Sequence, residues 1–140
     1  MNKEPVSLRA ASVSFRAEKR KVKPKKLYER IETTRLVLEK REGTLDNVIK
    51  YDLVLKEPVE HVNASIGTIT IFFNLLEVKI DKVNYRGKGY MNEAMTKLME
   101  VALEGRYKVE INPTNEDSIN LFAGLGFTEK EKGTYTKYIV

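Results

Sequence analysis

A short basic stretch with two glycines carries the clearest chemical signal in this sequence. The residues Arg86-Gly87-Lys88-Gly89-Tyr90-Met91 follow an apolar segment and precede a segment with helical periodicity. Unpaired backbone amides and the positive end of the helix dipole meet at a helix N-terminus, so this position favours a phosphate or a pyrophosphate. Gly87 and Gly89 allow the backbone to approach such a ligand closely, and Arg86 and Lys88 add positive charge.

Two common phosphate-binding motifs do not match this stretch. The Walker A motif, G-x-x-x-x-G-K followed by Ser or Thr, is absent. The dinucleotide-binding fingerprint needs a third glycine where this chain has Asn92. The alternative to an anion site is an ordinary turn between a strand and a helix, because short glycine motifs often occur without a ligand. From the residues alone, both interpretations stay open.

Hydrophobic periodicity predicts the elements that position this loop. Apolar residues recur at helical spacing from Met91 to Ala102, and Gly105 is the predicted stop. Asn115 is the predicted N-cap of a second helix, which ends at Gly124 or Gly126. Apolar and β-branched residues predict strands at 35–39, 48–56, 66–73, 75–83 and 107–111, with a last strand or hairpin from Phe127 and residues 134–140. This order of elements predicts an α+β fold with a mixed sheet.

The positive charge of the chain is concentrated at its N-terminus. The 140-residue sequence carries a formal net charge of +5. Residues 1–30 hold ten lysines and arginines against three acidic residues, whereas the other 110 residues hold fifteen against seventeen. We therefore expect a basic, partly disordered extension over residues 1–30 and one folded domain over residues 31–140. A basic arm of this kind can bind nucleic acid, and a solvated tail is the alternative.

The absence of some residue types excludes several kinds of site. The chain has no cysteine, so it has no disulfide, thiolate nucleophile or cysteine metal site. His61 is the one histidine, which excludes multi-histidine metal sites and histidine-based triads. No apolar run reaches the roughly 18 residues that span a membrane, and no secretion signal is recognisable. We therefore expect a soluble, cytoplasmic protein with no metal and no membrane partner.

Three motifs resemble those of the GCN5-related N-acetyltransferases (GNAT). Residues 85–90 followed by Glu93-Ala94 resemble the acetyl-CoA motif Q/R-x-x-G-x-G/A. Residues 115–121 followed by Gly126-Phe127 resemble the next family motif, N-x-x-S…GF. Residues 31–38 resemble the opening strand of the ribosomal-protein acetyltransferases in that family. The motifs occur in the family's order and at its spacing.

The resemblance implies a fold, a cosubstrate and the contacts of that cosubstrate. It covers about residues 31–140 and implies a GNAT-like acyl-CoA N-acyltransferase fold with a mostly antiparallel sheet and flanking helices. Acetyl-CoA would lie in a cleft where strands 75–83 and 107–111 part. Its expected contacts are Asp81, Val83, Arg86, Gly87, Lys88, Gly89, Tyr90, Met91 and Asn115.

The resemblance also implies that a primary amine attacks the thioester directly. The amine must then lose a proton and the CoA thiolate must gain one. Glu77 is the candidate base because several relatives carry an acid at this place, and an exposed strand glutamate is the alternative. Ser118 is the candidate proton donor to the thiolate, because Phe122 stands where many relatives have a tyrosine.

Three further departures from the family pattern bear on affinity and on the acceptor. Met91 stands where the family prefers glycine or alanine, and Asp81 stands where an apolar strand residue is usual. Residues 40–47 alone join the first two predicted strands, where the family normally has two helices that wall the acceptor site. Either this wall is missing or the basic residues 1–30 replace it. A site without the wall is open, which favours the amine of a protein or peptide.

Two classes of function follow from the resemblance. The first is an N-acetyltransferase that moves an acetyl group from acetyl-CoA to the primary amine of a protein or peptide. The alternative is a catalytically degenerate GNAT-fold protein that captures a partner protein, which Met91, Phe122 and the short connection favour. Contact with nucleic acid through residues 16–30 and a homodimer also stay open.

Overall fold

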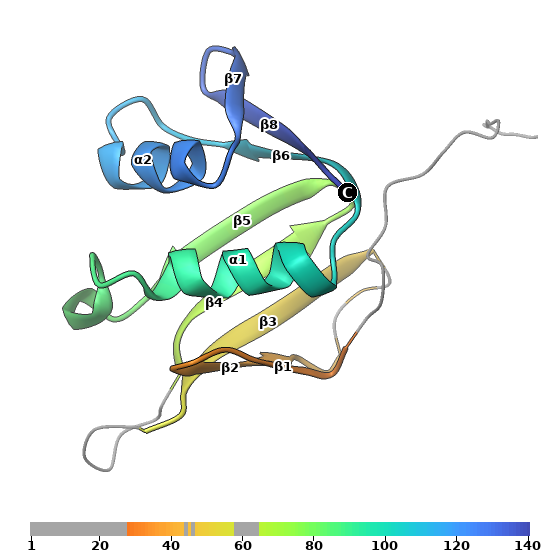
Figure 1. The fold of residues 1–140 in the computed structure, drawn as a ribbon, viewed down its shortest axis with the longest axis vertical. Coiled ribbons are helices and arrows are strands. Elements are labelled where there is room, and N and C mark those ends of the chain that lie inside the picture. Colours follow the sequence, from red (N-terminus) through yellow and green to blue (C-terminus); the bar gives the residue numbers. More distant parts are fainter. Residues whose placement is uncertain (1–27, 44, 46, 58–64) are drawn as a thin grey trace, which may run out of the picture.

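The structure is a computed structural model that describes residues 28–43, 45, 47–57 and 65–140. The predictions made for residues 1–27 and for His61 lie outside these residues. The described residues form a sheet with two α-helices (Figure 1). The elements are β1 (Arg30–Glu32), β2 (Leu36–Lys40), β3 (Val48–Leu55), β4 (Ser65–Phe72), β5 (Leu75–Ile80), the 3₁₀ turn η2 (Val83–Tyr85), α1 (Tyr90–Val101), β6 (Gly105–Glu110), α2 (Glu116–Gly124), β7 (Thr128–Glu131) and β8 (Thr134–Ile139).

The sheet is mixed and mostly antiparallel. Its strand order is β1-β2-β3-β4-β5-β6-β8-β7. Neighbouring strands are antiparallel except β5 and β6, which are parallel because α1 carries the chain back between them. The predicted α+β fold, with a mixed, mostly antiparallel sheet and flanking helices, is confirmed.

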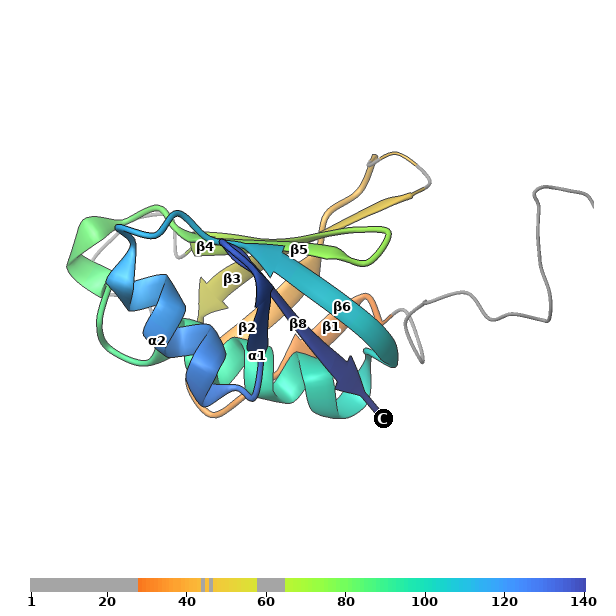
Figure 2. The same ribbon diagram turned by 90° about the horizontal axis from the view of Figure 1, so that it is seen from above.

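One face of the sheet is apolar and faces both helices. Figure 2 shows α1 and α2 on the same side of β4 and β5. Leu53 and Ile69 are buried on this face, and Met95 and Leu98 are buried on α1. Because alternate residues of a strand point to opposite faces, the buried positions of β3 and β4 form the core together with α1. Neither helix of the described residues is long and apolar enough to cross a membrane.

The opposite face of the sheet is polar and partly solvated. Asp52, Thr68 and Thr70 occupy the alternate positions of β3 and β4 and are half-buried. Arg41 forms an ion pair with Asp52 beside this face. Neither α1 nor α2, the helices of the described residues, covers it (Figure 2). Antiparallel strands tolerate water on one face, so the sheet does not need a second helical layer there.

Strands β5 and β6 part soon after they begin. They pair at two positions, Leu75 with Lys108 and Leu76 with Val109. Beyond them, residues 77–80 of β5 have no partner from β6 in the described part of the chain, while the other edge of β5 stays paired with β4. The structure therefore contains the parted strands that the family resemblance implies.

Gly67 allows β4 and β5 to approach closely at the end of β5. It pairs with Ile80, and a Cβ atom at residue 67 would lie 2.1 Å from the carbonyl oxygen of Lys79. No side chain fits at this position unless the backbone of β5 moves. Glycine at residue 67 therefore holds the end of β5 against β4, on the side away from β6.

Replacing Gly67 with alanine is expected to destabilise the fold by about 1–3 kcal/mol, since the new methyl group must push the β5 backbone aside. Thermal unfolding measures this loss. Gly124→Ala is the matched control, because a Cβ atom at this exposed helical glycine would meet no atom within 4 Å beyond its chain neighbours and the backbone of its own helix. This variant should be at least as stable as the wild type. An unchanged midpoint for Gly67→Ala would contradict the close approach.

Several helix and strand boundaries differ from those predicted from the sequence. The strand predicted over residues 75–83 ends at Ile80, because the chain then turns into η2. The helix predicted to stop near Gly105 ends earlier, at Val101, because Ala102 has already left the helical conformation with a φ of -125°. The strand predicted over residues 107–111 begins at Gly105, which has a φ of 111°. Periodicity does not predict β1, since a strand of three residues is too short to show any.

Candidate functional site

A pocket of about 500 Å³ opens beside the unpaired part of β5. It lies between the end of β5, the start of α1 and the start of α2. Pockets of this size are typical of small-molecule and cofactor sites. The lining residues are Val78, Lys79, Ile80, Tyr85, Arg86, Gly87, Gly89, Tyr90, Met91, Asn92, Asn115, Asp117, Ser118, Asn120 and Leu121.

Two residues of the glycine loop that leads into α1 have a left-handed backbone conformation. The φ angle is 71° at Gly87 and 84° at Gly89, conformations that glycine adopts without strain. Gly89 is the N-cap of α1, so the helix begins at Tyr90, one residue before the predicted start. The turn itself therefore requires both glycines, and the groups around it decide whether an anion can bind.

Backbone amides at the start of α1 are available to an anion. In the described residues, no backbone carbonyl accepts a hydrogen bond from the amides of residues 87–92. The amide of Glu93 is the first that donates, to the carbonyl of Gly89 at 3.0 Å. Unpaired amides at a helix N-terminus carry the positive end of the helix dipole. Most of the residues that own these amides line the pocket, so the pocket suits a phosphate group.

Arg86 connects the glycine loop to the end of β5. Its Nε donates a hydrogen bond to the carbonyl oxygen of Ile80 at 2.9 Å. Tyr85 and Tyr90 pack edge to face beside it, with 5.9 Å between ring centroids. Since Arg86 also lines the pocket, its guanidinium adds a cation next to the free amides.

A second helix N-terminus faces the same pocket. Asn115 caps α2 as predicted, because its Oδ1 accepts a hydrogen bond from the amide of Ser118 at 3.2 Å. This bond uses the acceptor of the Asn115 side chain and leaves its amide group as a donor. Asn115 and Ser118 both line the pocket. Asp117 lines it as well and is the one acid among the lining residues.

Four of the predicted site residues lie outside the pocket lining. Glu77 is exposed on β5, on the polar face of the sheet. Asp81 pairs with Lys79 at 3.4 Å, and Val83 is 67% exposed in η2. Lys88 contributes its carbonyl oxygen to Arg35. The structure brings the others together at the pocket: Arg86, Gly87, Gly89, Tyr90, Met91, Asn115 and Ser118.

Sequence reasoning missed several residues that line the pocket. Alternation along β5 could have found Val78 and Ile80, which lie on the helical face of the sheet next to the parting. Helical spacing could have found Leu121, one turn after Ser118. The remaining missed residues are Lys79, Tyr85, Asn92, Asp117 and Asn120.

Phe122 lies in the core and not in the pocket lining. Its side chain is fully buried, and its ring packs edge to face on Phe127 with 5.1 Å between centroids. The residue expected at the place of the family's tyrosine therefore has an apolar, structural environment in this chain.

Glu93, in the first turn of α1, is bonded to the turn between β1 and β2. Its Oε2 accepts hydrogen bonds from the Thr33 hydroxyl at 2.5 Å and from the Arg35 amide at 2.7 Å. Its Oε1 accepts from Arg35 Nε at 2.7 Å. Local sequence patterns do not predict this cluster, since Arg35 and Glu93 are 58 residues apart in the chain.

Glu93 is expected to make the stability of the protein depend on pH in acid. Burial raises the pKa of this carboxyl, but hydrogen bonds from the Thr33 hydroxyl and from the Arg35 amide and side chain outweigh burial and hold the pKa below its ordinary value of 4.5. The free energy from these bonds is present above pH 4.5 and is lost as the pH falls below 4.5 through the folded-state pKa.

The variant Glu93→Gln should therefore be less stable than the wild type at neutral pH by about 1–3 kcal/mol. The difference should narrow as the solution is acidified below pH 4.5. Urea unfolding of both proteins over a range of pH measures this difference in the free energy of unfolding. A difference that stays constant through the acid range would mean that the Glu93 carboxylate does not contribute as the structure indicates.

A family model places this chain in a known class. Residues 55–127, just over half of the chain, match the model described as "Acetyltransferase (GNAT) family". The matched residues include β4, β5, the glycine loop, α1 and the whole pocket lining. The chain therefore belongs to the GNAT acetyltransferase family.

A solved structure shows the same fold. The crystal structure of the microcin C7 self immunity acetyltransferase MccE, in complex with acetyl-CoA and AMP, matches with a TM-score of 0.54 and 16% sequence identity. The match covers 67% of this chain and 62% of that chain, so this chain spans less than two thirds of its length. A search of curated proteins finds no match.

Proposed function

We propose that this protein transfers the acetyl group of acetyl-CoA to a primary amine, with the amine of a protein or peptide as acceptor. The observation that carries the proposal is the pocket at the parting of β5 and β6, which is lined by Gly87 and by residues 89–92 with their free amides. Family membership supports the donor, and the open sheet face supports the choice of acceptor.

The pocket residues fit the diphosphate of CoA. When bound, acetyl-CoA supplies an acetyl group that is activated as a thioester. The amides of residues 87–92 and the Arg86 guanidinium offer donors and positive charge to the phosphates. Asn115 offers its side-chain amide group from the other side of the pocket. The unpaired edge of β5 at residues 77–80 offers backbone groups to the amides of an extended ligand.

Glu77 is the proposed general base. It lies on the polar face of the sheet and one residue beyond the last pair of β5 with β6, at the point where the strands part. An amine that approaches on this face meets the Glu77 carboxylate before it reaches the opening. The carboxylate removes a proton from the ammonium group, so the neutral amine can attack.

Ser118 is the proposed proton donor to the departing thiolate. Its hydroxyl belongs to the first turn of α2 and lines the pocket. The buried Phe122 has no hydroxyl to perform this step. Three further predicted contacts of the CoA moiety lie outside the pocket lining and stay predictions: Asp81, Val83 and Lys88.

The proposed acceptor follows from the open face of the sheet. Residues 41–47 join β2 and β3, where the family resemblance leads us to expect two helices. Among the described residues, no helix covers the face that carries Glu77, which favours a large substrate. The likeness of residues 31–38 to the ribosomal-protein acetyltransferases agrees with a protein substrate, and a cytoplasmic location fits the cysteine-free sequence.

Calorimetric titration with acetyl-CoA, followed by detection of free CoA thiol, tests the proposed function. We expect micromolar to millimolar binding, and release of thiol that depends on an added peptide amine. Binding without thiol release from any of a panel of peptide and small-molecule amines would favour the alternative of a degenerate binding protein. An absence of binding would remove the acetyltransferase function.

A further inference from the structure

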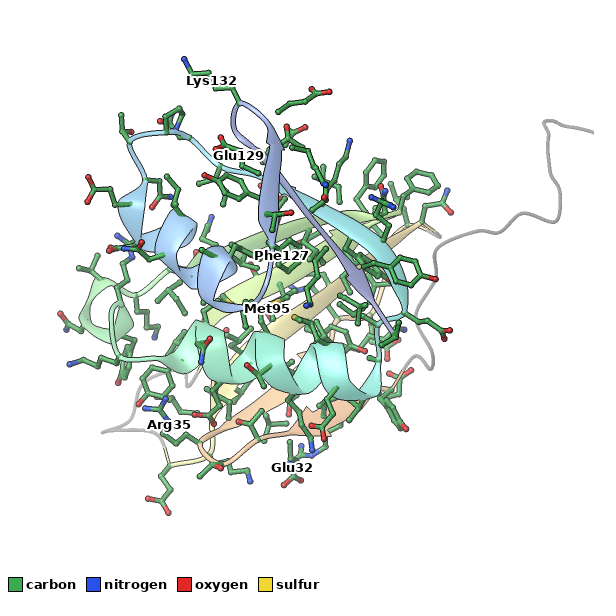
Figure 3. All side chains as sticks on the ribbon, turned by 45° about the horizontal axis from the view of Figure 1, so that its top comes forward. Glu32, Arg35, Met95, Phe127, Glu129 and Lys132 are labelled. Carbon is green, nitrogen blue, oxygen red and sulfur yellow. The ribbon has the colours of Figure 1, made fainter. Side chains whose placement is uncertain are left out.

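Arg35 contacts the glycine loop from a distant part of the chain. It follows the turn between β1 and β2, and Figure 3 shows it beside the start of α1. Its Nη1 and Nη2 both donate to the carbonyl oxygen of Lys88 at 3.3 Å. Its guanidinium carbon lies 4.0 Å from the ring centroid of Tyr90, in cation–π contact. Arg35 therefore holds both the loop and the first helical residue.

The bond to Lys88 fixes the direction of the next amide. In a trans peptide the carbonyl of one residue and the N–H of the following residue point in opposite directions. The carbonyl of Lys88 points toward Arg35, so the N–H of Gly89 points away from Arg35. Gly89 lines the pocket, and a Cβ atom at this residue would lie 3.5 Å from Arg35 Nη2. The guanidinium thus lies on one side of the loop, and the N–H of Gly89 points to the other side, toward the pocket.

Arg35 also neutralises an acid at the same helix N-terminus. Glu93 lies in the first turn of α1, where its negative charge would repel a phosphate at the free amides. Arg35 Nε is 2.7 Å from Glu93 Oε1, and both carboxylate oxygens are engaged by Arg35 or Thr33. The pair has no net charge, so the positive end of the helix dipole stays available to an anion.

We propose that Arg35 is a positioning residue for the acetyl-CoA site: it orients the Gly89 amide through the Lys88 carbonyl and cancels the charge of Glu93. This inference rests on the proposed function, because it assumes that acetyl-CoA phosphates bind at the glycine loop. Arg35 acts through the loop and does not line the pocket itself.

The first comparison is between two arginines in similar ion pairs. Arg35→Met removes every donor but keeps an apolar chain over Tyr90. Arg41→Met breaks the ion pair between Arg41 and Asp52. The Arg41 and Asp52 side chains are 46% and 25% exposed, close to the 41% and 19% of Arg35 and Glu93. In calorimetry with acetyl-CoA, Arg35→Met should raise the Kd about 10-fold to 100-fold while Arg41→Met leaves it unchanged. The kcat at saturating acetyl-CoA should stay within about twofold of the wild type, because Arg35 does not contact the reacting atoms.

The second comparison separates positioning from general stability. Adding Glu93→Gln to Arg35→Met removes the uncompensated carboxylate, so the double variant should bind acetyl-CoA more tightly than Arg35→Met alone. A merely structural role predicts that the second substitution weakens binding further. Arg35→Lys keeps the charge but loses the forked contact, and it should fall between the wild type and Arg35→Met. If Arg35→Met does not fold, Arg35→Lys and Arg41→Lys provide the same comparison.

The outcomes of these titrations distinguish this inference from the proposed function. A wild-type protein that does not bind acetyl-CoA overturns the proposed function and this inference with it. Wild-type binding that Arg35→Met and Arg35→Lys both retain overturns the role of Arg35 and leaves the acetyl-CoA site intact. Equal losses from Arg35→Met and Arg41→Met would also overturn it, since they would reflect the fold and not the loop.

Discussion

Replacing Gly89 with glutamate is expected to weaken the binding of acetyl-CoA by about 100-fold or more. The new carboxylate would stand at the N-cap of α1, where the phosphates are proposed to bind. Its repulsion of the phosphates is expected to cost about 3 kcal/mol of binding free energy, which corresponds to the change in Kd. The left-handed backbone of Gly89, with a φ of 84°, adds strain for any side chain. Calorimetric titration with acetyl-CoA measures the change.

Gly124→Glu is the matched control for this variant. It adds the same charge at an exposed glycine in α2 that does not line the pocket. A Cβ atom there would meet no atom within 4 Å beyond its chain neighbours and the backbone of its own helix. Its Kd for acetyl-CoA should equal that of the wild type. Since Gly89→Glu also strains the backbone, thermal melts must show that it is folded at the temperature of the titration. Unchanged affinity in folded Gly89→Glu would mean that the glycine loop does not bind the cosubstrate.

Glu77→Gln is expected to lower kcat by about 100-fold to 10,000-fold, which is the usual contribution of a general base. The substitution keeps the size of the side chain and removes its ability to accept a proton. The Kd for acetyl-CoA should not change, because Glu77 lies outside the pocket lining on the opposite face of the sheet. Steady-state kinetics with a peptide amine, together with calorimetry, separate these two effects.

Glu131→Gln, at an exposed glutamate on β7, serves as the control and should keep wild-type kinetics. If Glu77→Gln retained full kcat, another group or a bound water would have to act as the base. A biological effect that survives Glu77→Gln, in a protein without measurable turnover, would favour the alternative of a partner-binding protein.

Much of the fold could be predicted because its signals are local. The period of apolar residues changes from two in residues 66–73 to 3.6 in residues 91–102, and the structure has β4 and α1 there. The residue type of Asn115 and the two acidic residues after it predict an N-cap, and its side chain makes the expected bond. The turn into α1 needs positive φ at Gly87 and Gly89, which the glycines signal directly.

Other features could not be predicted because they depend on distant contacts. The partner of Glu93 lies 58 residues earlier, and nothing in the local sequence of Arg35 indicates that it reaches the glycine loop. The requirement for glycine at residue 67 arises from the approach of Lys79 on the next strand. The outward position of Val83 follows from the end of β5 at Ile80, because the chain leaves the sheet before residue 83.

The most direct test of the acetyl-CoA site is a titration of the ¹⁵N-labelled protein with acetyl-CoA, followed by amide NMR. We expect the largest shifts at the amides of residues 87–92, with smaller shifts at the start of α2, because the phosphates should accept hydrogen bonds from the free N–H groups of α1. The amides of β1 to β3 should change little. Saturable binding that leaves residues 87–92 unshifted, or shifts confined to the polar face of the sheet, would contradict the account.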